Sequence, residues 1–234
     1  MDYLGIDITY PLKFAWRVWQ SIRLRKRDIR ISPQARWNGQ TLLGGHNTVS
    51  SDVCIGHTRV GRFTYIRQDC DLAFCEVGSF CSIASGVRVV RFRHPADTFV
   101  STSPAFFSTV GQCGKTFVRE NRFEEQRLID GRSAIIGNDV WIGRGCNLKC
   151  TNPTKPLVIG DGAVIASDSV VVKNVPPYAI VGGNPAQIIK YRFPPDVIEA
   201  LLRIKWWDWS LDKIHDNFKY FNNIDKFISL HDRS

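Results

Sequence analysis

Aliphatic residues recur every six positions through the middle of the chain, and a small residue often follows each of them. The step is kept in four runs, namely Val60, Ile66 and Leu72; Val77 and Ile83; Ile136, Ile142 and Leu148; and Ile159, Ile165 and Val171. Six residues suit one short strand and one turn, so three such units close a triangular coil with the aliphatic residues inside. A helix would need a period near 3.6. The pattern therefore predicts an all-β solenoid, a parallel β-helix.

The repeat is interrupted at two places. Residues 151–156 add a short local loop between two runs. A much longer gap, from about residue 90 to residue 134, contains no six-residue step. Loops of this length inside a compact repeat are usually functional. We therefore expect the inserted loop 90–134 to carry part of a functional site.

Two regions outside the repeat have a helical pattern. Near the N-terminus, apolar residues follow the spacing of one face of an amphipathic helix: Leu12, Ala15, Trp16, Trp19 and Ile22. The six-residue step stops after residues 176–177. A helix is then expected to begin at residues 194–196, and Ser210 to cap a second one that runs through Phe221.

These patterns divide the chain of 234 residues into three parts. We expect a basic amphipathic helix within residues 1–40, a β-helix domain over residues 41–190 with the inserted loop 90–134, and a helical cap over residues 191–234. The aromatic-rich C-terminal helices are expected to cover the open end of the coil, as capping elements do.

The positive charge is concentrated near the N-terminus. The chain has 31 Lys and Arg against 22 Asp and Glu, a net charge of +9, and more than half of this excess lies before residue 37. Two interpretations stay open: the helix packs its tryptophans on the main domain, or it lies on an anionic membrane surface. No nucleic-acid-binding motif accompanies the charge, so we expect no nucleic-acid partner.

Composition and cysteine usage exclude other classes. With 44% hydrophobic and 23% charged residues the chain can bury a core. It has no run of 18 apolar residues, and Asp2 and Asp7 stand where a signal peptide needs basic residues. Its seven cysteines include no Cys-x-x-Cys pair. We therefore expect a cytoplasmic protein with reduced, core-packed thiols and no metal site.

Several strings carry a family resemblance. They are Ile-Gly-Asn-Asp-Val-Trp-Ile-Gly at 136–143, Val-Pro-Pro-Tyr-Ala-Ile-Val-Gly-Gly-Asn-Pro-Ala at 175–186, Arg-His-Pro-Ala-Asp at 93–97, Ser-Thr-Ser-Pro-Ala-Phe-Phe at 101–107 and Lys-Trp-Trp-Asp-Trp at 205–209. Over about residues 49–215 the chain resembles the left-handed β-helix, hexapeptide-repeat acyltransferases, in their xenobiotic acetyltransferase branch. The resemblance implies acetyl-CoA as co-substrate and a homotrimer with active sites between subunits.

His94 is the candidate catalytic residue. It is the one histidine of five that lies in the long insertion, and a proline follows it. A neutral imidazole there can accept the proton of a hydroxyl whose oxygen attacks a thioester carbonyl. An ordinary loop histidine fits the spacing equally well. The match to the family's loop motif favours catalysis by direct attack, without an acyl-enzyme.

The resemblance also implies a set of CoA-binding residues: Trp141, Gly143, Ser167, Lys173 and Lys190. Trp141 would line the pantetheine slot, and the main chain at Ser167 would contact CoA. Lys173 and Lys190 would bind phosphates. Backbone N–H groups at residues 141–143 are candidates for an oxyanion hole, since Gly143 allows close approach. The alternatives are a rim-packing Trp141 and solvent-facing lysines.

The predicted function is O-acetylation of a sugar in a bacterial surface polysaccharide. The basic N-terminal helix favours this acceptor, since it would suit an enzyme that meets lipid-linked or nucleotide-linked glycans at the inner face of the cell membrane. Acetylation of an antibiotic hydroxyl or an amino-sugar nitrogen is the alternative. A γ-type carbonic anhydrase, for which His46 and His57 are the coil histidines, and a non-enzymatic trimeric scaffold are more distant possibilities.

Overall fold

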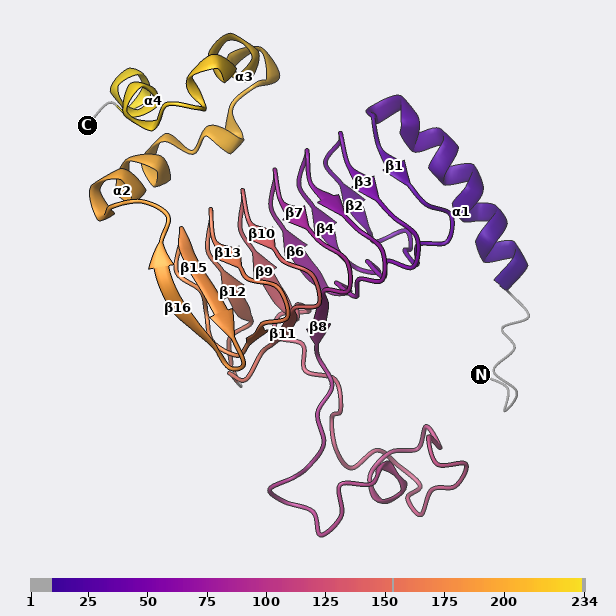
Figure 1. Ribbon diagram of the computed structural model, residues 1–234. Coiled ribbons are helices and arrows are strands. Elements are labelled where there is room, and N and C mark those ends of the chain that lie inside the picture. Colours follow the sequence, from indigo (N-terminus) through magenta and orange to yellow (C-terminus); the bar gives the residue numbers. More distant parts are fainter. Residues whose placement is uncertain (1–9, 153, 233–234) are drawn as a thin grey trace.

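The structure, a computed structural model, describes residues 10–152 and 154–232. Short strands stack in coils around one axis and form a triangular prism, with helices at both ends (Figure 1). In this part of the chain the strands form an eight-stranded, a five-stranded and a three-stranded sheet. Every strand pair is parallel except the last pair in the chain, β15 with β16.

The eight-stranded sheet has its strands in the order β1 (Arg30–Ile31), β3 (Thr48–Val49), β5 (Tyr65–Ile66), β7 (Ser82–Ile83), β10 (Trp141–Ile142), β13 (Val164–Ile165), β15 (Ala179–Gly183) and β16 (Ala186–Tyr191). The five-stranded sheet contains β2 (Leu42–Leu43), β4 (Arg59–Val60), β6 (Cys75–Val77), β9 (Ala134–Ile136) and β12 (Leu157–Ile159). The three-stranded sheet contains β8 (Arg88–Val90), β11 (Asn147–Lys149) and β14 (Val170–Val171).

The aliphatic residues of the six-residue repeat point into the prism. In the eight-stranded sheet the predicted Ile66, Ile83, Ile142 and Ile165 stack directly above one another, and the column is extended at its two ends by Val49 and Val181. Each is at most 3% exposed, and burying such a side chain stabilises the fold by about 1.5–3 kcal/mol. The prediction of a parallel β-helix with these residues inside is confirmed.

The coils extend beyond the sequence repeat at both ends. β1 already pairs with β3, Arg30 beside Thr48, although no six-residue step leads into it. At the other end the stack continues past residues 176–177, because Tyr178 turns the chain with a φ of 57° and β15 pairs with β13. The chain then folds back as β16, antiparallel to β15.

The N-terminal helix α1 (Tyr10–Leu24) lies at the β1 end of the prism (Figure 1). Its contact with the coils includes Arg17, which is 6% exposed and donates from Nη1 to the Ala35 carbonyl at 3.0 Å. Trp16 packs on Trp37, with ring centroids 4.9 Å apart. Trp19 is 56% exposed. Trp16 therefore fits the interpretation in which the helix packs its tryptophans on the main domain. Trp19 faces outward, as the membrane interpretation requires.

The C-terminal segment forms α2 (Pro195–Ile204), α3 (Leu211–Asn217) and α4 (Ile224–His231). Ser210 caps α3, as predicted, by accepting from the Lys213 N–H. The helix expected to run on through Phe221 instead stops at Asn217. A 3₁₀ turn (Phe218–Tyr220) follows and redirects the chain into α4. Phe227 of α4 then packs in a cluster with Trp209. No helix among the described residues is both long and apolar enough to cross a membrane.

Candidate active site

The long insertion leaves the prism after β8 and returns at β9, so it connects the three-stranded sheet to the five-stranded sheet. It projects away from the coils (Figure 1). Its two arms run side by side near the root. The Arg93 N–H donates to the Glu125 carbonyl at 2.9 Å, and the Arg127 N–H donates to the Arg91 carbonyl at 2.7 Å. The insertion is therefore a tethered arm with its own hydrogen bonds.

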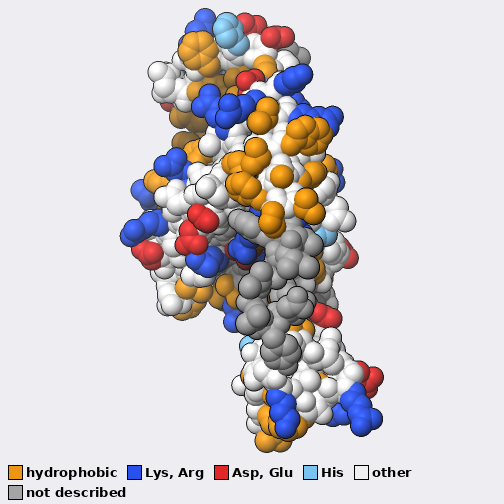
Figure 2. Space-filling model, turned by 90° about the vertical axis from the view of Figure 1, so that its right-hand side faces the viewer, with side chains coloured by type: hydrophobic (Ala, Val, Ile, Leu, Met, Phe, Trp, Pro, Cys, Tyr) orange, Lys and Arg blue, Asp and Glu red, His pale blue; other side chains and the backbone are white. Residues whose placement is uncertain are grey.

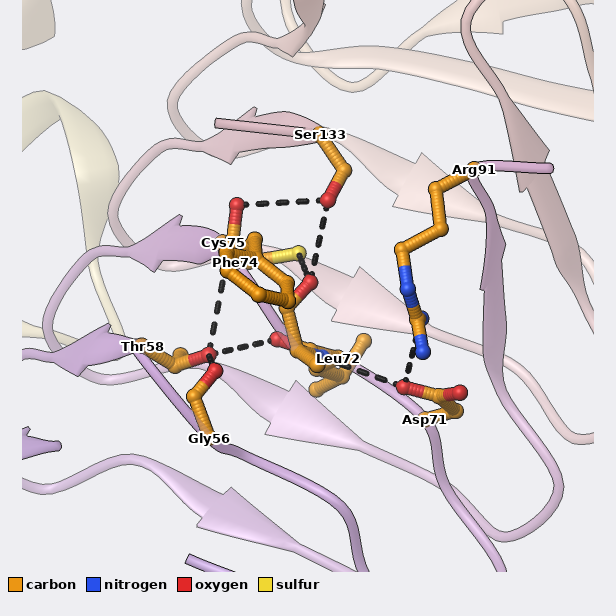
Figure 3. A network of polar contacts seen from close by, with 9 residues as sticks. Gly56, Thr58, Asp71, Leu72, Phe74, Cys75, Arg91 and Ser133 are labelled. Atoms are coloured by element: carbon orange, nitrogen blue, oxygen red, sulfur yellow. Dashed lines mark hydrogen bonds and ion pairs between the residues drawn. The ribbon is translucent and has the colours of Figure 1, made fainter. Parts of the chain in front are cut away.

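Polar contacts fix both roots of the insertion on one coil (Figure 3). On the outgoing arm, Arg91 pairs with Asp71 at 2.9 Å, and both side chains are largely buried. On the returning arm, the Ser133 N–H donates to the Phe74 carbonyl at 2.7 Å, and Ser133 Oγ donates to the Ala73 carbonyl at 3.0 Å. Asp71, Ala73 and Phe74 belong to one turn, so a single coil positions both arms.

A small aromatic core orders the outer part of the insertion. Phe107 is fully buried, and its ring lies 6.0 Å from that of Phe99 and 5.6 Å from that of Phe123. The Arg93 guanidinium stacks over Phe123 at 4.6 Å. Glu125 accepts hydrogen bonds from Ser108 at 3.2 Å and from Gln112 at 3.1 Å. The arm therefore holds its shape by local packing.

His94 sits in this insertion with one ring nitrogen fixed. Its Nδ1 lies 2.8 Å from the Thr102 carbonyl oxygen, and its ring meets the ring of Phe107 edge-on, 5.9 Å between centroids. A carbonyl oxygen only accepts hydrogen bonds, so Nδ1 carries the proton and Nε2 keeps its lone pair. The imidazole is exposed. It therefore has the tautomer and the access that a general base needs.

The cleft next to His94 has a basic lining. It has a volume of about 320 Å³ and lies between the root of the insertion and β11. Four cations line it, namely Arg91, Arg93, Arg127 and Lys149, together with Asp97. Arg127 also donates to the Thr151 carbonyl at 3.0 Å, which ties the insertion to the loop at 151–156. The cleft thus offers hydrogen-bond donors for a polar, anionic or oxygen-rich molecule.

Four of the five predicted CoA-binding residues lie on the eight-stranded sheet or its turns. Trp141, Val164, Ile180 and Lys190 follow one another across neighbouring strands. Trp141 is 57% exposed in the single chain. Gly143 lies against the next coil, where a Cβ would stand 2.5 Å from the Ser167 nitrogen. Ser167 and Lys190 are exposed.

The structure separates the remaining predicted residues from this row. Lys173 lies with Thr151 and Asn174 along a different cleft, of about 340 Å³. The cleft that contains His94 includes no residue of the Trp141 row among the described residues. One chain therefore does not bring its own His94 and Trp141 to one site.

Two of the three N–H groups expected as oxyanion donors at residues 141–143 are already used. The Trp141 N–H donates to the Ala163 carbonyl at 3.0 Å, and the Gly143 N–H donates to the Ile165 carbonyl at 2.8 Å. These bonds belong to the ladder between adjacent coils, which the fold requires. The assignment of these two N–H groups to an oxyanion hole was wrong.

The prediction of core-packed coil cysteines is confirmed for Cys70, Cys75, Cys81 and Cys146, which are buried. Cys150, which was also expected in the core, is only partly buried. Burial raises the pKa of the Cys75 and Cys81 thiols to about 12 and that of Cys70 to about 11. Thiols with such values stay protonated at neutral pH and are poor nucleophiles.

The coil histidines take part in stacking. The His46 ring stacks on Phe63 at 4.4 Å, and the His57 ring stacks on Phe74 at 4.7 Å. Among the described residues no group of three His, Cys, Asp or Glu side chains is placed to hold a metal ion.

The sequence analysis missed the Thr102 carbonyl, which orients His94, and Asp71, which holds the root of the insertion. Thr102 lies inside the string 101–107 that resembles the family, but a backbone acceptor leaves no mark on residue type. The pair of Asp71 and Arg91 joins residues 20 positions apart, and only the coil geometry brings them together.

Comparison with individual known proteins places the chain in a family, although no protein-family profile matches it. It is 42% identical over 145 residues to a probable macrolide acetyltransferase from Lysinibacillus sphaericus, covering 61% of this chain and 74% of that one. It is 33% identical over 190 residues to a chloramphenicol acetyltransferase from Agrobacterium fabrum, covering 80% and 84%.

A solved structure of a hexapeptide-repeat acetyltransferase from Vibrio cholerae, complexed with acetyl coenzyme A, is also similar. It is 17% identical with a TM-score of 0.49, over 81% of this chain and 92% of that one.

The chain belongs to the hexapeptide-repeat acetyltransferases, in their xenobiotic acetyltransferase branch. It is an acetyl-CoA-dependent acyltransferase. This activity replaces the two other interpretations of the sequence, the non-enzymatic scaffold and the carbonic anhydrase.

Proposed function

We propose that the protein is an O-acetyltransferase that acetylates a hydroxyl of a sugar in a bacterial surface polysaccharide, with His94 as the general base. The observation that carries the chemistry is the bond between His94 Nδ1 and the Thr102 carbonyl, 2.8 Å long. It leaves Nε2 free to accept a proton. The basic cleft beside His94 supports a polar, oxygen-rich acceptor.

In the proposed reaction, His94 Nε2 takes the acceptor hydroxyl proton while the hydroxyl oxygen bonds to the thioester carbonyl carbon. The carbon–sulfur bond then breaks, and the imidazolium returns its proton to the CoA thiolate. The Thr102 carbonyl stabilises the imidazolium through its contact with Nδ1. The buried thiols support direct transfer without a cysteine intermediate.

CoA is proposed to lie along the row that contains Trp141 and Lys190, with Gly143 and Ser167 beside it and Lys173 on its phosphate path. Because His94 and this row lie apart in one chain, we assign each active site to two subunits of a homotrimer of left-handed coils. The separation of the two groups supports this assignment. We place the protein in the cytoplasm, at the inner face of the cell membrane.

The similarity to macrolide and chloramphenicol acetyltransferases favours a second candidate, acetylation of an antibiotic hydroxyl. An amino-sugar nitrogen is a third acceptor of the same chemistry. Release of free CoA thiol from acetyl-CoA, followed across polysaccharide sugars, amino sugars and antibiotics, distinguishes them. The proposal is supported if a polysaccharide sugar that accepts acetyl on a hydroxyl has the highest kcat/KM of all acceptors tested. A higher kcat/KM for an antibiotic would overturn it.

His94→Ala tests the assigned base. We expect acetyl transfer to fall by about 10²–10⁴-fold, since general-base catalysis supplies a factor of this size. Binding of acetyl-CoA should stay unchanged. His215→Ala is the matched control, because the His215 side chain is 84% exposed on α3. A His94→Ala enzyme with wild-type turnover would contradict the mechanism.

A further inference from the structure

An apolar face of α1 is left outside the prism. Leu12 is 76% exposed, Trp19 56% and Ile22 63%. These residues are separated by seven and three positions, so they lie along one face of the helix. Figure 2 looks onto this end of the molecule and shows hydrophobic side chains gathered in a patch, with Lys and Arg side chains beside it. Isolated exposed apolar residues are common, but such a stripe on one helix marks a binding surface.

The other face of α1 anchors the helix to the coils. Arg17 and Ser21 are the buried residues of that face, at 6% and 9% exposure. Arg17 donates to the Ala35 carbonyl and so ties the helix to the coils, whereas Ser21 Oγ donates within the helix, to the Val18 carbonyl at 2.7 Å. An amphipathic helix usually turns its apolar face to the core. Here an arginine is buried while Trp19 and Ile22 stay outside, so the fold itself does not use the apolar stripe.

The charge around the stripe is mostly positive. Residues 10–27 contain six basic side chains and no Asp or Glu, and one exposed carboxylate, Asp28, follows them. The Arg23 guanidinium lies 5.6 Å from the Trp19 ring centroid, at the border of the stripe. Arg25 and Lys26 are exposed in the turn that follows the helix. Apolar side chains bordered by cations match the two layers of an anionic lipid surface, acyl chains below and phosphates above.

We infer that α1 lies flat on an anionic lipid bilayer, with Leu12, Trp19 and Ile22 at the boundary of headgroups and acyl chains and with Arg23, Arg25 and Lys26 on lipid phosphates. The helix has 15 residues and is about 22 Å long, which suits a position along the surface. The inference does not depend on the identity of the acceptor, because lipid binding needs no acetyl transfer.

A second copy of the chain fits this face less well. Two such faces in contact would bring two clusters of arginine and lysine together without a carboxylate on either helix. Like charges that face one another across an interface are unfavourable. The stripe is also narrow, with three large apolar residues, whereas stable interfaces bury far larger areas.

Sedimentation of the full-length protein with lipid vesicles tests the inference. The vesicles contain phosphatidylcholine alone or phosphatidylcholine with phosphatidylglycerol. We expect at least about tenfold stronger binding to the anionic vesicles, with clear weakening at high salt. Trp19→Gln with Ile22→Gln should lower binding at least about tenfold. Arg25→Gln with Lys26→Gln should lower it at low salt and reduce its salt dependence.

The matched control is Phe218→Gln, because Phe218 is 64% exposed in the C-terminal segment, away from α1. It should bind vesicles as the wild type does. Absence of wild-type binding to anionic vesicles would overturn the inference, as would unchanged binding of the Trp19 and Ile22 variant. If that variant instead loses an oligomeric state in sedimentation velocity while the wild type ignores lipid, the face is a contact between copies. Acetyl transfer to a soluble acceptor, measured in parallel, tests the proposed function separately.

Discussion

At the scale of single residues, the orientation of His94 depends on the main chain. Its partner is the Thr102 carbonyl, so no side-chain substitution at residue 102 removes the acceptor. The ring also rests against Phe107, which is fully buried. The position of the imidazole is therefore a property of how the insertion folds, and changes in the aromatic core of the insertion will reach the base through its backbone.

The exposed Cys113 is expected to react first with a thiol reagent in the folded protein. Burial raises the pKa of Cys75 and Cys81 to about 12, so these thiols stay protonated and shielded. Absorbance with Ellman's reagent at neutral pH should show one fast equivalent, and all seven cysteines should react after unfolding. Cys113→Ser should lose the fast equivalent. A fast phase that survives this substitution would contradict the assignment.

His231 should make the stability of the C-terminal helices sensitive to mild acid. Burial, together with the nearby Lys213, lowers the pKa of His231 below its ordinary value of 6.5. The unfolded chain therefore binds a proton more readily than the folded one. The contribution of His231 is complete above the unfolded pKa and is lost as pH falls through the lowered folded value.

We therefore expect the free energy of unfolding of the wild type to fall between about pH 7.5 and pH 5.5, and to fall less in His231→Phe. The variant keeps an aromatic ring against Trp209, whose centroid lies 4.7 Å from that of His231. Urea titrations at the two pH values measure the difference. His215→Gln should behave as the wild type does, and an identical pH dependence in His231→Phe would refute the prediction.

At the scale of elements, neighbouring coils approach so closely that some positions admit no side chain. A Cβ at Gly61 would lie 2.5 Å from the Ser79 nitrogen and from the Gly78 carbonyl carbon, both of them main-chain atoms. The backbone of the next coil cannot rotate away as a flexible side chain could. The spacing of the coils therefore depends on glycine at these corners.

Gly61→Ala should destabilise the protein by about 2 kcal/mol, because the added methyl forces two coils apart. Gly39→Ala is the control, since nothing lies within 4 Å of a Cβ at that position. It should leave the free energy of unfolding nearly unchanged. Urea unfolding of both variants measures the contrast, and equal losses would show that close coil packing is not the cause.

The elements differ in how far the sequence could predict them. The coils follow from a simple period, because each inward position needs an apolar side chain such as Ile142 and each tight corner needs a small one such as Gly61. β1 could not be predicted in this way, since the chain enters the first coil from α1 through a left-handed turn at Asp28. The insertion has no period at all. Its shape comes from packing around Phe107 and from contacts with a distant turn.

The site was predictable by residue type and not by arrangement. His94 and Trp141 carry recognisable chemistry, but one lies on the projecting insertion and the other on the eight-stranded sheet. Distances between separate elements depend on the whole fold. The oxyanion assignment failed for a related reason, because sequence does not show that the Gly143 N–H is already bonded to the next coil.

At the scale of the whole molecule, the insertion joins the three-stranded sheet to the five-stranded sheet, whereas the Trp141 row lies on the eight-stranded sheet. In the proposed trimer, the His94 of one subunit meets the Trp141 row of its neighbour. Co-expression of His94→Ala and Trp141→Ala subunits should then restore activity that neither variant has alone. An intact site needs a subunit that keeps His94 beside a neighbour that keeps Trp141. If the two variants assemble at random in equal amounts, about a quarter of the sites meet this condition. Thiol release by the mixed enzyme measures this, and failure to exceed both single variants would contradict shared sites.

The two ends of the prism have one more consequence. A stack of short parallel strands presents unpaired main-chain groups at each end, and so could serve as a template for endless addition of further chains. Here α1 lies across the first coil, and β16 reverses direction after the last parallel pair before α2 turns away. In the eight-stranded sheet, therefore, the last strand is antiparallel to its neighbour and the first strand packs against a helix. At these two edges the chain keeps a strand geometry close to that of a fibre and opposes the addition of a further parallel strand.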